Sequence, residues 1–238
     1  MLAGIDLAWT ATGVSGLAVL TDALELRTVP AKRYLDPSLT AALLELTGGV
    51  VPDVVALDSP LVIPNRTGSR PAENALKAHR FPAGHIAVFA SNQQFFDRYG
   101  GLRAAGLLHL WHDLRWPVDL APGRHTWAFE TYPRGVLASV FPNLTGLRYK
   151  GSAPKAVLLT GLAELQAALL GYAHAHQWQV PPNSLLHAPA DTPYLADVLD
   201  AVLCLITAAR VLKGPDACIT FGTDWHQGVI VLPRPYSA

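Results

Sequence analysis

The sequence predicts an α/β fold, in which helices cover one mixed β-sheet. Three apolar, strand-like stretches open the chain and are separated by short turns, which is typical of an antiparallel meander. Later apolar stretches alternate with segments of helical spacing, which is typical of parallel strands joined by helical crossovers. Half of the 238 residues are hydrophobic and 15% are charged, which is enough apolar material for one large core. We therefore expect a single domain over residues 1–238.

The first half of the chain contains the meander, a helix and one further strand. The helix is expected to end at Gly48 and Gly49, and the buried strand after it is stopped by Ser59 and Pro60. The expected elements are strands at 2–9, 14–20, 24–29 and 54–57, turns at 10–13 and 21–23, and a helix at 37–46.

Residues 61–120 differ from both flanks, because they combine loops, helical stretches and scattered basic and aromatic residues. We interpret them as an insertion between the fourth and fifth strands. The last helix is expected to begin at Pro193, with Thr192 as its N-cap. Right-handed crossovers would place the fourth and fifth strands beside the first. The elements expected after the insertion are strands at 125–130, 218–221 and 228–232 and helices at 154–174 and 193–212.

Composition and charge exclude several classes of protein. Basic and acidic residues number 18 each, so any contact with nucleic acid has to come from a local patch and is expected to be weak. No apolar run reaches the length of a membrane span, and the N-terminus lacks a signal-peptide pattern, so we expect a cytoplasmic protein without membrane contact. Cys204 and Cys218 are expected to be buried free thiols. Neither a His-Glu-x-x-His nor a Gly-x-Ser-x-Gly motif occurs, which disfavours zinc and a serine hydrolase.

Five carboxylates stand in apolar contexts, where acids are rarely buried without a partner. Three interrupt or end apolar strands. The other two lie three residues apart in the helix expected at 193–212, so they share one helix face. The helix dipole would favour the first of these two acids but explains the second much less well. The five residues are Asp6, Asp58, Glu130, Asp197 and Asp200.

Converging acids repel one another, and a pair about 4 Å apart costs about 4 kcal/mol at an effective dielectric of about 20. Either some members are protonated or a cation binds between them. Carboxylate oxygens select a hard cation such as Mg²⁺ or Mn²⁺. Two such ions about 4 Å apart would activate water and stabilise the leaving oxygen of a phosphodiester.

Each acid also has a purely structural explanation, which the sequence leaves open. Asp6 could accept hydrogen bonds from the following turn, and Asp58 could cap a turn. Glu130 could pair with Arg134. Asp197 could be only a helix-start charge, and Asp200 could pair with an arginine of the insertion.

Around these acids the sequence resembles the domain of unknown function 429 family, which is predicted to contain nucleases of the RNase-H-like fold. The matching stretches keep the order of the family and span nearly the whole chain. They are Gly4-Ile5-Asp6, Ala56-Leu57-Asp58-Ser59-Pro60-Leu61, Arg70-Pro71-Ala72-Glu73, Phe129-Glu130-Thr131-Tyr132-Pro133, Arg148-Tyr149-Lys150 and Asp197-Val198-Leu199-Asp200-Ala201.

The resemblance implies a five-stranded mixed sheet with the first strand in the centre. RNase-H-like enzymes place one acid on the first strand, a second on a neighbouring strand, and one or two on a late helix. Asp6 matches the first position, Asp58 or Glu130 the second, and Asp197 and Asp200 the helix. The implied metal ligands are Asp6, Asp58, Glu130 and Asp200, with Asp197 as a further catalytic group.

Two groups of basic residues could contact phosphates. One follows the fourth strand and the other precedes the helix at 154–174. Arg70 and Glu73 could instead form a local ion pair. Three tryptophans, Trp111, Trp116 and Trp127, could stack on bases, although core or surface packing is the favoured explanation. The candidate substrate-binding residues are Arg66, Arg70, Lys77, Arg80, Lys150 and Lys155.

The function expected from the sequence is hydrolysis of nucleic acid by a nuclease or related phosphodiesterase that depends on Mg²⁺ or Mn²⁺. One alternative is an actin-like, ATP-dependent phosphotransferase, although Ala8 stands where that fold has a glycine two residues after the acid. The other is a nucleic-acid-binding module that has kept the fold and lost catalysis. The sequence indicates no oligomeric state.

Overall fold

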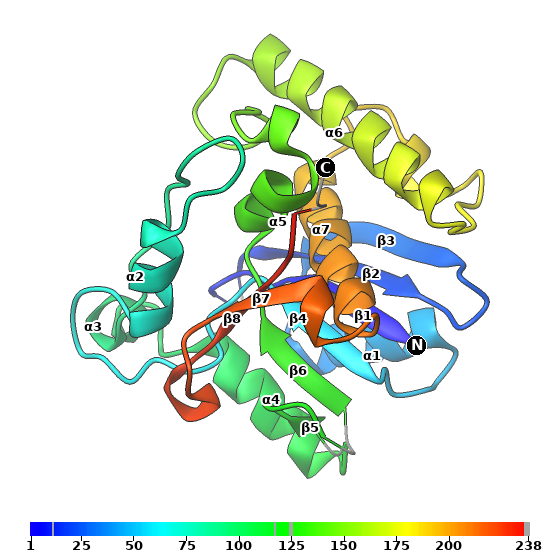
Figure 1. Cartoon of the computed structure of the whole chain (residues 1–238). Coiled ribbons are helices and arrows are strands. Elements are labelled where there is room, and N and C mark those ends of the chain that lie inside the picture. The colour runs from blue at the N-terminus through cyan, green and yellow to red at the C-terminus, as the bar shows by residue number, and fades with distance from the viewer. Residues whose placement is uncertain (11, 117, 124–125, 236–238) are drawn as a thin grey trace.

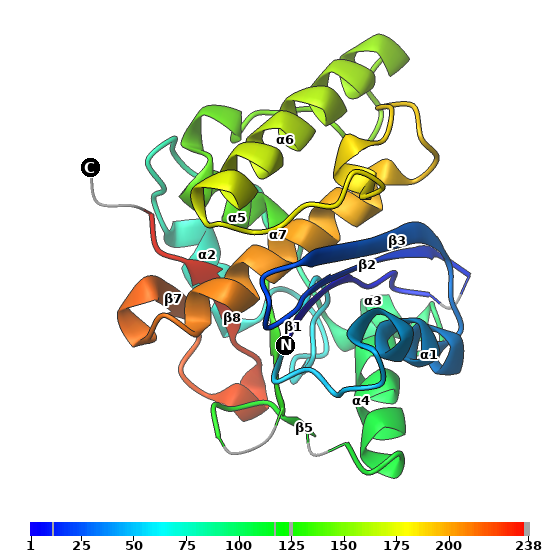
Figure 2. The same ribbon diagram turned by 90° about the vertical axis from the view of Figure 1, so that its right-hand side faces the viewer.

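A mixed sheet of eight strands runs through the protein, with helices on both faces (Figures 1 and 2). The structure is a computed structural model that describes residues 1–10, 12–116, 118–123 and 126–235. The strand order is β3-β2-β1-β4-β6-β8-β7, and β5 pairs with β6 outside this path. The expected α/β architecture is confirmed, whereas the five strands implied by the family resemblance are too few.

The chain begins with the expected antiparallel meander. Its strands are β1 (Leu2–Asp6), β2 (Val14–Leu20) and β3 (Leu26–Arg33). β2 has the expected bounds, but β1 ends three residues early, at Asp6. Part of the turn expected at 10–13 lies outside the described residues, because Ala11 is not among them.

The other half of the sheet is mostly parallel. β4 (Val54–Leu57) pairs with β1, β6 (Thr126–Glu130) with β4, and β8 (Ile230–Pro233) with β6. β7 (Cys218–Phe221) closes the edge antiparallel to β8. Placing the fifth strand beside the first was wrong, because β2 already occupies the second edge of β1, so β6 pairs with β4 instead. His125, expected in this strand, lies outside the described residues.

Alternating side chains of the sheet build two cores, one on each face. Leu2 and Ala56 contribute to the core under α5 (Pro133–Val140), α6 (Lys155–Ala175) and α7 (Leu195–Val211). Ile5 and Leu57 contribute to the core under α1 (Asp36–Thr47) and α4 (Arg103–Asp113). α7 lies directly across β1, β2 and β4, and α6 forms an outer layer beyond it (Figure 2).

The expected insertion contains three helices and a short strand. α2 (Pro71–Ala78) and α3 (Gln93–Asp97) lie to one side of the sheet in Figure 1, whereas α4 packs beneath the sheet with α1. β5 (Val118–Asp119) follows, and Pro117 before it lies outside the described part of the chain. Trp111 and Trp116 are buried and stacked on each other at 5.3 Å between ring centroids, so neither offers a face to a base.

Two helical details differ from the expectation. α7 begins at Leu195 rather than Pro193, because a turn precedes it in which the Leu195 amide donates to the Thr192 carbonyl at 3.2 Å. α5 was not predicted at all and starts at Pro133, two residues after the end of β6. The described part of the chain also contains short 3₁₀ segments, which are η1 (Pro142–Leu144), η2 (Leu185–His187), η3 (Pro215–Ala217) and η4 (Trp225–Gln227).

α6 is more apolar than the sequence analysis anticipated. Judged by length and composition alone, this helix of 21 residues could cross a membrane, contrary to the expectation that no such run exists. In the structure 39% of its most apolar window is buried, and the helix packs against α7. Cys204 and Cys218 are buried free thiols, as expected.

Candidate active site

Three of the five acids lie at one edge of the sheet. β1, β4 and β6 are parallel neighbours, so their carboxyl ends meet there. Asp6 and Glu130 are the last residues of β1 and β6, and Asp58 directly follows β4. The Asp58 amide donates to the Ile5 carbonyl at 2.8 Å, which continues the ladder and fixes Asp58 beside the end of β1.

Two glycines bring the helix acids to the same place. A Cβ atom on Gly4 would lie 2.1 Å from the Ala201 carbonyl oxygen, and one on Gly16 would lie 2.0 Å from the Asp197 carbonyl oxygen. Gly16 pairs with Asp6 across the β1–β2 ladder. Because these side chains are missing, the backbone of α7 rests on the sheet and Asp197 and Asp200 reach the end of β1.

The side chain of Lys150 joins three of the acids. Its Nζ lies 2.8 Å from Asp6 Oδ2, 3.0 Å from Asp197 Oδ1 and 2.5 Å from Asp200 Oδ2. The neighbouring Tyr149 hydroxyl donates to Asp200 Oδ1 at 2.7 Å. Asp197 and Asp200 thus share one helix face, as their spacing predicts. We refer to Asp6, Asp197, Asp200 and Lys150 as the acid cluster.

The acid cluster is short of positive charge. Burial raises the pKa of Asp6 to about 7, against the opposing effect of Lys150 and with a further rise from Asp200. Burial opposes the charge of Lys150, but Asp200, Asp6 and Asp197 outweigh it and raise the Lys150 pKa well above its usual value. One ammonium therefore faces three carboxylates, an arrangement that favours a proton on Asp6 or a further cation.

Asp58 lies beside the acid cluster without a cation of its own. Burial raises its pKa well above the usual range, and the charges of Asp6 and Asp200 raise it further. No ion pair or side-chain hydrogen bond connects Asp58 to any residue that the structure describes. Asp58 lines a narrow cleft of about 50 Å³ together with residues of the insertion.

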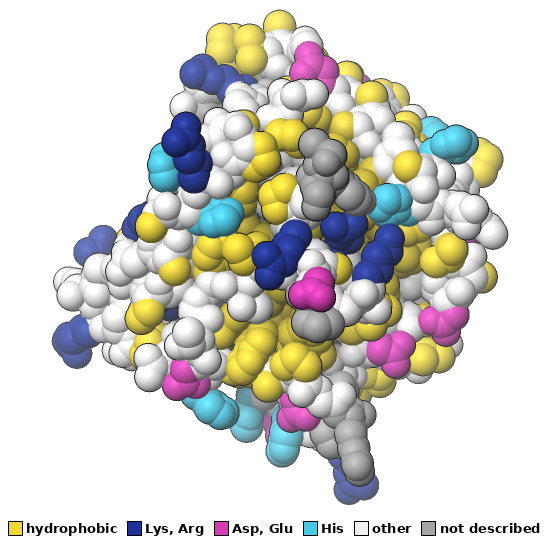
Figure 3. Space-filling view, viewed as in Figure 1, with side chains coloured by type: hydrophobic (Ala, Val, Ile, Leu, Met, Phe, Trp, Pro, Cys, Tyr) yellow, Lys and Arg dark blue, Asp and Glu magenta, His cyan; other side chains and the backbone are white. Residues whose placement is uncertain are grey.

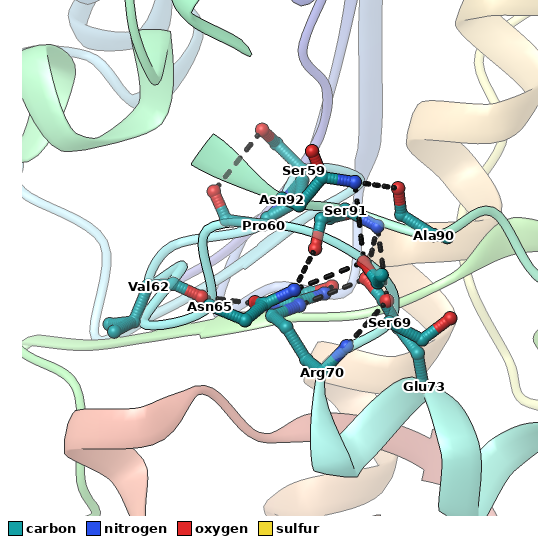
Figure 4. Close-up of polar contacts among 12 residues, drawn as sticks. Ser59, Pro60, Val62, Asn65, Ser69, Arg70, Glu73, Ala90, Ser91 and Asn92 are labelled. Atoms are coloured by element: carbon teal, nitrogen blue, oxygen red, sulfur yellow. Dashed lines mark hydrogen bonds and ion pairs between the residues drawn. The ribbon is translucent and has the colours of Figure 1, made fainter. Parts of the chain in front are cut away.

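Glu130 belongs to a second ionic network, centred on Arg70. Arg70 is 1% exposed, and its Nη1 and Nη2 donate to the two Glu130 oxygens at 2.7 and 2.6 Å. Its Nε donates to Glu73 at 2.9 Å, which confirms the local ion pair, and Glu73 also accepts from the Ser91 amide (Figure 4). Glu130 thus pairs with Arg70 rather than with Arg134. Burial still raises the Glu130 pKa, although Arg70 opposes that rise.

Comparison with protein families identifies the chain. The family model described as "Protein of unknown function (DUF429)" matches residues 4–224, which include the acid cluster, Asp58, Arg70 and Glu130. The chain belongs to this family. No curated protein and no solved structure matches it.

The basic residues expected to bind substrate in this DUF429 protein are dispersed. Arg66, Arg80 and Lys155 are exposed, whereas Lys77 donates to Ser69 Oγ at 2.5 Å. The left-hand edge in Figure 3, where the insertion lies, shows Lys and Arg side chains separated by uncharged ones. Arg70 and Lys150 lie in the two ionic networks described above. The basic residues therefore form no continuous patch on the face shown.

Sequence reasoning gave no role to several residues around the site. Tyr149 binds Asp200, and Trp9 and Phe89 line the same cleft as Asp58. The signals available were the position of Tyr149 in a stretch that matches the family and the proximity of Trp9 to Asp6 in the sequence. Arg134, which was considered as a partner of Glu130, is instead exposed at the start of α5, where its charge opposes the rise in the pKa of Tyr132 to about 12 that burial produces.

The donor set of the DUF429 site suits a hard divalent cation. Asp6, Asp197 and Asp200 direct carboxylate oxygens at one point, the position of Lys150 Nζ, and Asp58 stands beside it. Within the described ranges no three His, Cys, Asp or Glu residues form a ready metal-ligand group. In this arrangement Lys150 supplies the positive charge.

Proposed function

We propose that this DUF429 protein is a cytoplasmic, RNase-H-like phosphodiesterase that uses Mg²⁺ or Mn²⁺ to hydrolyse nucleic acid. The observation that carries the proposal is the convergence of Asp6, Asp197 and Asp200, with Asp58 beside them, at the carboxyl end of parallel strands. Acids in excess of cations at a sheet edge are the arrangement that two-metal phosphodiester hydrolysis requires.

The topology supports the fold assignment within this proposal. Within the longer sheet, β3-β2-β1-β4-β6 form a five-strand stretch with β1 in its centre. β1, β2 and β3 are antiparallel, and β4 and β6 are parallel to β1. This mixed pattern, with an acid on the central strand and two on a late helix, is the pattern that the RNase-H-like resemblance implies.

The surroundings of the acids suggest their roles. Asp6, Asp58 and Asp200 would hold the metal, and Asp197 would hold or orient a ligand. Of the two candidates for the second position, Asp58 fits better, because both Glu130 oxygens accept from Arg70. When bound, the metal would supply an activated water and stabilise the leaving oxygen. Tyr149 fixes the rotamer of Asp200 through its hydrogen bond.

Lys150 supports a second candidate function. Its ammonium contacts three carboxylates, so the protein could also be a module in which a lysine takes the place of the metal. Such a module would bind nucleic acid without cleaving it. Lys150 is one-third exposed, however, which leaves its side chain room to leave the acids and contact a phosphate.

Cleavage and metal binding separate the two candidates. Labelled single- and double-stranded DNA and RNA should be incubated with the protein in Mn²⁺, Mg²⁺ or chelator, and Mn²⁺ binding measured by calorimetry. We expect Mn²⁺-dependent cleavage, which Asp200→Asn and Asp58→Asn abolish and Glu164→Gln, an exposed acid on α6, leaves unchanged. Binding of nucleic acid without cleavage or Mn²⁺ binding would favour the second candidate and reject the first.

A further inference from the structure

The cleft beside Asp58 is lined by charged and by apolar side chains. The charged residues are Asp58, Arg70, Glu73 and Glu130, and Arg70 pairs with both glutamates. The apolar and aromatic residues include Trp9, Pro60, Val88, Phe89 and Tyr132. A ligand at this cleft would therefore contact aromatic and apolar side chains with Asp58 beside them.

Trp9 and Phe89 line the cleft and are both partly open to solvent. Trp9 is 37% exposed and Phe89 is 40% exposed, and their centroids lie 4.8 Å apart with the planes inclined at 39°. Phe95 packs its edge against Trp9 at 5.2 Å. The two rings are thus supported by the insertion and still present surface to a ligand.

The loop that carries Trp9 is held by a buried arginine. Arg103 Nη1 donates to the carbonyl oxygens of Ala8 at 3.2 Å and of Thr10 at 3.1 Å, on either side of Trp9. Its Nε binds Asp36 at 2.7 Å. Because Trp9 follows Asp6 by three residues, Arg103 fixes the ring at a constant distance from the acid cluster.

The insertion side of the cleft is held in a similar way. The Tyr132 hydroxyl donates to the Ala87 carbonyl at 2.9 Å, two residues before Phe89. Tyr132 directly precedes α5, where the exposed Arg134 provides a cation close to the cleft. An anionic ligand with a flat ring would find both a stacking surface and a positive charge here.

We propose that one unpaired nucleobase of a single-stranded substrate stacks on the exposed parts of Trp9 and Phe89 at this cleft, with its adjoining phosphate directed to the metal ion that Asp6, Asp58 and Asp200 would hold. The inference rests on the proposed phosphodiesterase function and names its substrate class. A paired base is covered by its neighbours in a duplex and cannot stack on a protein ring. The cleft itself encloses only about 50 Å³, so the base would lie on the open surface of the two rings rather than inside the cleft.

Equilibrium binding tests the proposal independently of catalysis. Fluorescence anisotropy of a labelled single-stranded oligonucleotide, alone or annealed to its complement, is measured with Ca²⁺ in place of Mn²⁺. Trp9→Leu and Phe89→Leu keep apolar volume but remove the aromatic face. Tyr99→Leu is the matched control, because Tyr99 is an exposed aromatic that contacts Phe95 but does not line the cleft. Thermal melts establish that each variant is folded. If Trp9→Leu does not fold, the binding result for Phe89→Leu decides the test.

We expect the wild type to prefer the single strand, and Trp9→Leu or Phe89→Leu to weaken its binding about tenfold, with Tyr99→Leu unchanged. Unchanged affinity in both cleft variants, an equal loss in Tyr99→Leu, a preference for duplex, or no binding at all would overturn the inference. The cleavage assay is read separately. Cleavage that survives in a cleft variant with unchanged binding retains the proposed function and rejects this inference. If the wild type shows no cleavage but the cleft variants selectively lose binding of the single strand, this inference is retained and the proposed function is rejected.

Discussion

At the scale of single residues, the site is defined by an imbalance of charge. Lys150 provides one positive charge to three carboxylates, and Asp58 stands beside them with a raised pKa. Arg70 likewise forms ion pairs with both Glu130 and Glu73. The two networks differ in access, because Arg70 is buried whereas Lys150 is partly exposed. Arg70 therefore has a structural role, and Lys150 stands where a ligand could compete with it.

The raised pKa of Asp6 predicts a pH dependence of stability. Its pKa is about 7 in the folded protein against 3.8 ordinarily, so the folded state binds the proton more tightly. The resulting stabilisation is complete below the unfolded pKa and is lost as the pH rises through about 7. In chelator, the free energy of unfolding should fall between about pH 4 and about pH 7, with a smaller fall in Asp6→Asn. Urea titrations of the wild type and of Asp6→Asn at each pH measure the two free energies of unfolding. Identical pH profiles for the two proteins would contradict the raised pKa of Asp6.

Arg70 offers a test of the buried network. Arg70→Met leaves Glu130 and Glu73 buried without their cation, which should lower the free energy of unfolding by about 3–5 kcal/mol. Arg66→Met changes an exposed arginine of the same insertion and should alter stability by less than about 0.5 kcal/mol. Chemical denaturation compares the two variants. If both variants lose equally little free energy of unfolding, the ion pairs of Arg70 do not stabilise the insertion.

At the scale of elements, the close contact between α7 and the sheet positions the acids. Gly16→Ala would place a Cβ about 2.0 Å from the Asp197 carbonyl oxygen, so the helix has to move away. We expect destabilisation by about 1–3 kcal/mol together with weaker Mn²⁺ binding. Gly171→Ala, in α6 with open space around it, should be neutral or stabilising by up to about 1 kcal/mol. Calorimetry measures Mn²⁺ binding and thermal melts measure stability. Normal Mn²⁺ binding by Gly16→Ala would show that the contact of α7 with Gly16 does not position the acids.

The elements were largely predictable from hydrophobic patterning, because patterning reflects burial. β2, β4 and β7 have the bounds expected from sequence. α5 escaped prediction because only Thr131 and Tyr132 separate its eight residues from β6, so that Tyr132 and Pro133 resembled a terminator. α7 also begins two residues later than expected, because a turn closed by the hydrogen bond between Thr192 and Leu195 precedes it.

At the scale of the whole molecule, the acids were predictable but their partners were not. Asp6, Asp197 and Asp200 stand out because an acid in an apolar stretch requires an explanation. Lys150 lies 144 residues from Asp6 in a segment between helices, and its spacing says nothing about which acid it contacts. The Arg70–Glu130 pair spans 60 residues for the same reason. Partner choice between distant charged residues depends on the finished fold.

The stability of the whole protein should depend on a positive charge in the acid cluster, which either Lys150 or a bound Mn²⁺ could supply. Lys150→Met removes the positive charge from three carboxylates, so it should lower the melting temperature in chelator. Mn²⁺ should restore it, since a ligand at a hundred times its dissociation constant adds about 2.7 kcal/mol. Lys155→Met, an exposed neighbour, should show neither effect. A Lys150→Met protein that is equally unstable with and without Mn²⁺ would mean that the site does not hold a divalent ion.

The position of α7 near the end of the chain has a consequence during protein synthesis. A ribosome makes β1, β2 and β4 long before residues 195–211, so the apolar face that α7 covers waits for the last part of the chain. A chain interrupted before α7 would contain Asp6, Asp58 and Lys150 but neither acid of that helix. The acid cluster can therefore form only after α7 has been made.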